Sequence, residues 1–131
     1  MVEILKKQLD MAFDDAVKHV EQIVQEEGFS LIVTKSLDQI FAKKLGVTDY
    51  PRYSFILACG PEFAKAGLDV SKNVGLLYPC SFVVYEEESK VFAAHSSIMK
   101  IAAEIGFAPA NEMQPVIEMT GKAVHRAWSR L

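Results

Sequence analysis

The stretch from Tyr50 to Glu86 constrains the fold of this chain most, because it contains the two strongest strand signals and both cysteines. Residues 53–59 place apolar side chains on both alternating faces, which predicts a strand that is covered on both sides. Residues 80–85 alternate in the same way and predict a second strand with an apolar lining. The rest of the chain is therefore expected to pack around this stretch.

A sharp turn follows the first of these strands at Cys59-Gly60-Pro61. Gly60 can adopt backbone angles that are closed to other residues, and Pro61 suits the first position of a helix. We therefore expect a short helix over residues 62–68, which opens directly after the cysteine. Cys59 would then lie near a helix N-terminus, where the positive end of the helix dipole favours a thiolate.

The sequence before this stretch predicts two strands and two helices. Residues 2–8 alternate as a short strand at a sheet edge, with a helical start as the alternative. A clear amphipathic helix begins near Phe13, and residues 29–34 form the strand after it. Ser36 and Gln39 fit a capping box that opens a helix of about ten residues.

The sequence after this stretch predicts a hairpin and two more helices. Residues 86–90 are expected to form a polar hairpin loop, from which residues 91–95 return as an antiparallel strand. A short helix is expected from Ile98 to near Gly106. In the last helix we expect Asn111 as the cap and Pro115 in the first turn. Gly121 is a costly residue in the middle of that helix, which indicates close packing with another element there.

These elements describe one α+β domain over residues 1–131. Their order is strand, helix, strand, helix, strand, helix, strand, strand, helix, helix. Only the connection over residues 60–75 has the length of a compact parallel crossover, and the hairpin is antiparallel. We therefore expect a single-layer mixed, mainly antiparallel sheet packed with helices.

Composition limits the partners and the location. Half of the 131 residues (50%) are hydrophobic, which is enough to bury a core without an external staple. A net charge of -3, with Lys and Arg scattered along the chain, argues against nucleic acid as a partner. No signal peptide is visible, and no apolar run approaches the ~20 residues of a membrane span. We expect a cytoplasmic protein with no membrane partner and with reduced cysteines.

Several motifs occur in the order and spacing of a known family. They are Glu27-Gly28-Phe29, Lys44-Leu45-Gly46, Tyr53, Ala58-Cys59-Gly60-Pro61, Gly75-Leu76-Leu77-Tyr78-Pro79-Cys80 and Val83-Val84-Tyr85-Glu86. With them, residues 2–95 resemble the domain-of-unknown-function family 302. The resemblance implies a small α+β domain that is often a homodimer and has no established activity. The chain departs from the family at His95-Ser96-Ser97, where the family tends to carry an acidic residue and a proline.

The candidate ligand-binding residues lie mainly around the turn after the first strand. We expect Cys59, Gly60, Cys80, Tyr78 and Tyr53 to frame a modest pocket for a small molecule, an anion or a thiol-reactive species. If the two strands run antiparallel, Cys59 and Cys80 lie at the same edge of the sheet, and if they run parallel the sulfurs lie at opposite ends. The alternative for each cysteine is a buried, inert core position.

Metal and catalytic chemistry have little support in the sequence. A soft-metal set of Cys59, Cys80, His95 and Met99 can be assembled, but it lacks any recognised metal spacing. A histidine at a strand end is usually a surface residue. No catalytic group, cofactor motif or phosphate loop is marked, so we expect neither a metal nor a cofactor.

The sequence leaves three functions open. The first is a small-molecule or anion binding module with a cysteine-containing pocket. The second is a homodimeric interaction module without chemistry, built on the sheet or on the C-terminal helix through Met113, Ile117 and Trp128. The third is a thiol-based redox or sulfur-carrying protein.

Overall fold

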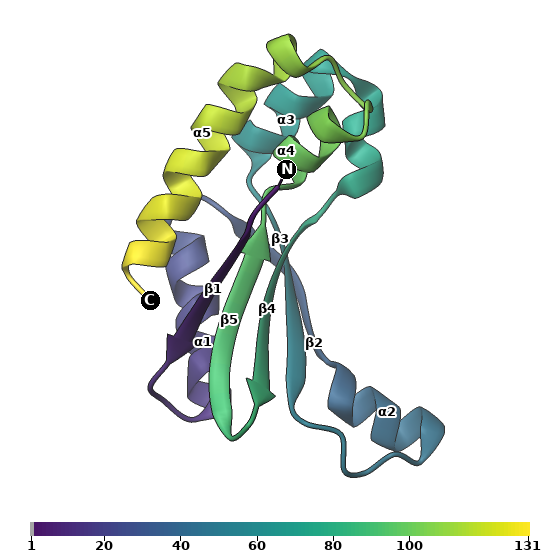
Figure 1. Ribbon diagram of the computed structural model, residues 1–131, viewed down its shortest axis with the longest axis vertical. Helices are drawn as coiled ribbons and strands as arrows, with labels where there is room; N and C mark the ends of the chain where they lie inside the picture. The colour runs from purple at the N-terminus through teal and green to yellow at the C-terminus, as the bar shows by residue number, and fades with distance from the viewer. Residues whose placement is uncertain (1) are drawn as a thin grey trace.

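The computed structural model describes residues 2–131 as a five-stranded sheet with helices packed against it (Figure 1). The strands are β1 (Ile4–Leu9), β2 (Ser30–Ser36), β3 (Tyr53–Cys59), β4 (Cys80–Glu87) and β5 (Lys90–Ser96). The helices are α1 (Phe13–Glu26), α2 (Leu37–Leu45), α3 (Pro61–Val70), the 3-10 helix η1 (Lys72–Leu77), α4 (Ile98–Glu104) and α5 (Ala110–Ser129).

The sheet is antiparallel throughout. Its strand order is β1-β5-β4-β3-β2, and every pair of neighbours runs in opposite directions. The expected α+β fold with a mainly antiparallel sheet is confirmed. The connection between β3 and β4 contains α3 and η1, and it returns the chain to the same end of the sheet, so it is not a parallel crossover. The end of β3 therefore lies beside the start of β4.

One face of the sheet is buried under α1 and α5. Alternate residues of β3 and β4 point to this face, and Ile56, Phe82 and Val84 are completely buried there. They belong to one hydrophobic core with residues of the two helices, such as Val20 and Met113. Figure 1 shows both helices on the same side of the sheet. This layer of side chains is the core of the fold.

The opposite face of the sheet has no helix over it within residues 2–131, and we call it the open face. It carries half-buried apolar and aromatic side chains from β3, β4 and β5, namely Tyr53, Phe55, Val83, Tyr85 and Phe92. The prediction that β3 is covered on both sides is wrong. An alternating pattern predicts to which face of the sheet each side chain points. It does not predict whether a helix packs on that face.

The edge strand β1 is tied to the end of α5. Lys7 Nζ donates hydrogen bonds to the carbonyl oxygens of Trp128 at 3.3 Å and Leu131 at 2.8 Å. Within residues 2–131, β5 is the one strand that pairs with β1. The lysine thus connects the outermost strand to the helix that lies over it.

Helix α2 projects from the end of the sheet (Figure 1). The expected capping box does not form, because the Ser36 hydroxyl donates to Asp38 Oδ1 at 2.7 Å. Burial raises the pKa of Asp38, but hydrogen bonds from the Tyr53 amide and from Ser36, together with the charge of Arg52, hold it below its ordinary value. Two apolar residues of α2 stay in solvent, Ile40 at 37% and Leu45 at 71% exposed.

Two further local predictions differ from the structure. The N-cap of α5 is Pro109, so Asn111 lies inside the first turn and Pro115 lies in the body of the helix. Pro109 fits the start of the helix because it has no amide hydrogen that would need a hydrogen-bond partner there. In the hairpin, β4 continues to Glu87, and the turn is only Glu88 and Ser89, which both have positive φ.

Candidate functional site

Four of the five predicted ligand-binding residues meet where β3 ends and β4 begins. Cys59, Gly60, Tyr78 and Cys80 line a cavity of ≈ 10 Å³, which we call the cysteine cavity. A space of this size holds about one water molecule. Tyr53 is not part of it, because it lies at the other end of β3, roughly 20 Å along the strand.

The two cysteines are neighbours in the sheet but point to different faces. Cys80 pairs with Ala58, which is fully buried on the helix-covered face, so Cys59 follows one residue later and points toward the open face. Both thiols are free. Burial, with a smaller contribution from Cys59, raises the pKa of the Cys80 thiol to about 12. Cys80 is therefore a protonated thiol at neutral pH.

Tyr78 has a clear structural contact at this end of the sheet. Its hydroxyl donates to the carbonyl oxygen of Ala64 in α3 at 2.9 Å. Burial, and then the nearby Cys80 and Cys59, raise the pKa of Tyr78 to about 12. A Cβ added at Gly67 would clash with this hydroxyl, so the glycine allows the tyrosine to approach α3. Tyr78 therefore holds α3 against the start of β4.

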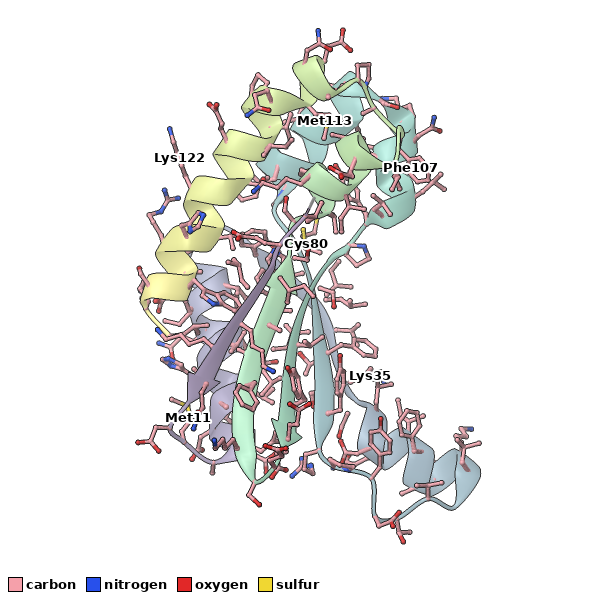
Figure 2. All side chains as sticks on the ribbon, in the orientation of Figure 1. Met11, Lys35, Cys80, Phe107, Met113 and Lys122 are labelled. Carbon is pink, nitrogen blue, oxygen red and sulfur yellow. The ribbon has the colours of Figure 1, made fainter. Side chains whose placement is uncertain are left out.

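A larger space lies between the sheet, α4 and α5, and we call it the α5 cavity. Its volume is ≈ 50 Å³. Figure 2 shows Cys80 at the level where the strands meet α3, α4 and α5. The cavity is lined by residues of β1, β5, α4 and α5 with a few others, namely Glu3, Leu5, Phe29, Cys80, His95, Ser97, Ile98, Met99, Lys100, Ile117, Thr120, Gly121, Val124 and His125. Cys80 and Met99 also line the cysteine cavity, so they form the wall between the two spaces.

His95 is the most distinctive group in the wall of the α5 cavity. It is only 6% exposed, and its ring stacks on Phe82 with the centroids 4.3 Å apart. Its Nδ1 lies 2.8 Å from the carbonyl oxygen of Ser81, which can only accept, so Nδ1 carries the hydrogen. Burial holds the pKa of His95 below its ordinary value, although the hydrogen bond to Ser81 opposes this. The imidazole is therefore neutral at neutral pH.

The expectation of a surface histidine at this strand end is wrong, and the sequence contained the signal that places it. Val91, Ala93 and His95 alternate along β5, and the register puts Ala93 and His95 opposite the buried Val84 and Phe82 of β4. A histidine on an otherwise apolar strand face is buried with its neighbours.

Gly121 also differs from its prediction. A Cβ built at this position meets no atom within 4 Å, so the glycine does not serve close packing with another element. It lies instead in the lining of the α5 cavity, between Ile117 and Val124 on one flank of the helix. The missing side chain leaves part of this space empty.

The soft-metal residues are only partly assembled. Cys80, His95 and Met99 line the α5 cavity, whereas Cys59 lines only the cysteine cavity. Across residues 2–131, no three or more His, Cys, Asp and Glu side chains gather in a way that would hold a metal ion.

The family model described as "Domain of unknown function DUF302" matches residues 5–130. The chain belongs to this family. The match includes α4 and α5, so membership of the DUF302 family extends beyond the resemblance seen over residues 2–95.

A crystal structure of an uncharacterized conserved DUF302 protein from Bacillus stearothermophilus shares the fold with a TM-score of 0.80. The two sequences are 19% identical, and the alignment covers 98% of this chain and 94% of that chain. A search of the curated proteins found no match. None of the helices within residues 2–131 of this DUF302 chain has the length and apolar character of a membrane span.

Proposed function

We propose that this DUF302 protein is a binding module for a small uncharged molecule, which it holds in the α5 cavity. The observation that carries the proposal is an open space of ≈ 50 Å³ with a buried neutral imidazole on its wall. Protein interiors are close-packed and rarely leave gaps larger than one water molecule. This space has room for about four water molecules, or for a ligand of about four or five non-hydrogen atoms.

The lining of the cavity favours a neutral guest over an anion. Its inner wall is largely apolar, with Leu5, Ile117 and Val124 among its side chains. Lys100, a cationic residue of the lining, is exposed at the rim. Transfer of a charge into an apolar space without a partner is costly, so an anion would gain little there.

The predicted cysteine residues fit this proposal through the wall that the two cavities share. Met99 is buried in this wall, and a rotamer change of its unbranched side chain would join the cysteine cavity to the α5 cavity. A ligand larger than five atoms would then reach Cys59, Gly60 and Tyr78 as well as Cys80. Tyr53 has no place in this site.

A filled cavity tests the proposal. Gly121→Leu adds a side chain into the α5 cavity, and Lys122→Leu adds the same side chain one residue later, where Figure 2 shows the lysine pointing away from the sheet. The probe is 1-butanol, and binding is followed by saturable NMR shifts of the Ile117 and Val124 methyl groups. We expect saturation in the wild type and in Lys122→Leu and none in Gly121→Leu. Equal saturation in all three proteins, or none in the wild type, contradicts the proposal.

A second candidate function is self-association through the open face. Tyr53 and Tyr85 stack with ring centroids 5.6 Å apart, and Lys6 Nζ lies 4.4 Å from the centroid of Phe92. Exposed apolar residues extend this surface at the strand edges, and Ile4 is 72% exposed. A contiguous apolar surface of this kind is typical of a protein interface.

The dimer interface that the sequence suggested on α5 is less suitable. Met113 is completely buried in the core of its own chain, and Ile117 and Trp128 are half-buried. Sedimentation over a range of concentrations tests the open face instead. Tyr85→Glu is expected to weaken the dimer, and Ile105→Glu, an exposed apolar residue after α4, is expected to leave it intact. A wild type that stays monomeric at every concentration excludes this function.

A further inference from the structure

We propose that His95 Nε2 is the hydrogen-bond acceptor for the ligand, so that the α5 cavity selects small molecules with a hydroxyl group over apolar molecules of the same size. This inference rests on the proposed function, because it assumes that the α5 cavity is a binding site. It goes further in assigning the chemical class of the ligand and the atom that recognises it.

The backbone of β4 fixes which nitrogen of His95 is free. Nδ1 donates to the Ser81 carbonyl oxygen at 2.8 Å, so the neutral ring leaves a lone pair on Nε2. The two nitrogens lie on opposite edges of the ring, so Nε2 points away from the β4 backbone. Within residues 2–131, no hydrogen-bond donor reaches this nitrogen. Phe82 occupies one flat face of the ring, and the unpaired edge is left to the cavity.

The other polar groups of the lining are weaker acceptors or already take part in hydrogen bonds within the protein. The Thr120 hydroxyl already donates to the Val116 carbonyl oxygen at 3.0 Å, and the Ser97 hydroxyl accepts from the Lys100 amide at 3.2 Å. The Cys80 thiol is protonated and is a weak acceptor. Glu3 and His125 are exposed. The Thr120 and Ser97 oxygens keep lone pairs, but a neutral imidazole nitrogen is a stronger acceptor than a hydroxyl oxygen, so His95 Nε2 is the preferred acceptor among these lining groups.

Water satisfies this acceptor poorly. A buried water is held by two to four polar partners, and the walls around His95 are largely apolar. A molecule with a hydroxyl group and a short apolar part can replace it, because the hydroxyl donates to Nε2 while the apolar part contacts Ile117 and Val124. Displacing a poorly held water by such a group favours binding.

Two isomers distinguish a hydrogen bond to His95 Nε2 from binding that depends on the size of the cavity alone. 1-Butanol and diethyl ether contain the same atoms, but only the alcohol can donate a hydrogen bond. The readout is the ¹⁵N resonance of His95 Nε2 in the wild-type protein, together with the methyl shifts of Ile117 and Val124. We expect the alcohol to bind about two- to tenfold more tightly than the ether, which is the range of one neutral hydrogen bond. Only the alcohol should move the Nε2 resonance toward that of a protonated nitrogen.

The outcomes distinguish the inference from the function on which it rests. If both isomers shift the methyl groups with equal affinity and neither moves the Nε2 resonance, the cavity binds ligands but His95 is not the anchor. If neither isomer shifts the methyl groups, the proposed function fails as well.

A variant provides a second measurement. His95→Phe keeps an aromatic ring to stack on Phe82 but removes the acceptor. We expect this variant to bind the two isomers equally, with the ether unchanged within about twofold. A preference for the alcohol that survives in a folded His95→Phe protein overturns the inference, and the wild-type nitrogen measurement decides the matter if the variant does not fold.

Discussion

Both faces of the sheet carry apolar side chains, but the two faces have different neighbours. On one face, Ile56 and Phe82 are completely buried beneath α1 and α5. On the other, Phe55 and Val83 occupy the next positions of the same strands and are only half-buried. The same residue types in the same strands thus contribute to the core on one side and to a surface on the other. A substitution should therefore lower the free energy of unfolding strongly on the covered face and weakly on the open face.

The largest difference is expected between Phe82 and Tyr85. Phe82→Ala opens a cavity in the core and should lower the free energy of unfolding by about 3–5 kcal/mol. Tyr85→Ala removes a half-buried ring from the open face and should cost about 1 kcal/mol or less. Urea unfolding at a concentration where the chain is monomeric measures both. Equal losses would mean that the open face is as well packed as the core.

The two thiols offer a chemical version of the same comparison. A pKa of about 12 for Cys80, against an ordinary 9.0, reduces its thiolate fraction at neutral pH on the order of a thousandfold. Cys80 should therefore be alkylated far more slowly in the folded protein than in denaturant. Cys59 points to the open face, directly before the N-cap Gly60 of α3, and should react first and faster than in denaturant. Peptide mapping after timed alkylation gives both rates.

Single variants provide the controls for this experiment. Cys80→Ser should leave the rate at Cys59 unchanged, since it replaces a protonated, uncharged thiol with an uncharged hydroxyl of similar size. A folded-state rate at Cys59 that is no higher than the denatured rate would remove any activating effect of α3 on this thiol.

The buried histidine makes the covered face sensitive to acid. Its pKa in the folded protein lies below the ordinary 6.5, so the unfolded chain takes up a proton first as the pH falls. The stability present above pH 6.5 is lost below it, by up to about 1.4 kcal/mol per pH unit. Urea unfolding from neutral pH down to about pH 5 measures this slope. His95→Phe should flatten it, and His125→Phe, at an exposed position, should not.

The smallest effect is expected at the two glycines inside the α-helices α3 and α5, Gly67 and Gly121. Gly121→Ala places a methyl group in open space and should raise the free energy of unfolding by about 1 kcal/mol, because alanine favours a helix. Gly67→Ala should instead destabilise the protein, since its Cβ would meet the Tyr78 hydroxyl and the end of Met99. Opposite signs in thermal unfolding support the assignment of Gly121 to a cavity wall. A destabilising Gly121→Ala would contradict it.

The sequence predicted the strands well because alternation is a local property. Residues 53–59 were assigned from their own pattern, and β3 has these bounds in the structure. The same pattern could have placed His95, since Val91 and Ala93 share its face. The sequence showed that antiparallel strands would put Cys59 and Cys80 at the same edge of the sheet. It could not show that they point to different faces, because the register depends on how the two strands pair and not on either strand alone.

The candidate site was harder to predict because its space is defined by several elements at once. The cost of Gly121 in a helix is visible in the sequence, but its reason depends on the distance from α5 to β1 and α4. Likewise, the sequence shows that Leu45 is an apolar residue of α2, but only the three-dimensional arrangement shows that it has no core to reach. Local patterns determine which way side chains point, and tertiary packing determines what they meet.

The bond from Lys7 to the end of α5 bears on how a guest molecule would enter and leave. An outermost strand can detach without disturbing the rest of the sheet, and Leu5, on that strand, forms part of the α5 cavity wall. The hydrogen bonds of Lys7 would therefore slow the detachment of β1. The exchange rate of the guest would depend on how often this one strand detaches and not on the unfolding of the domain.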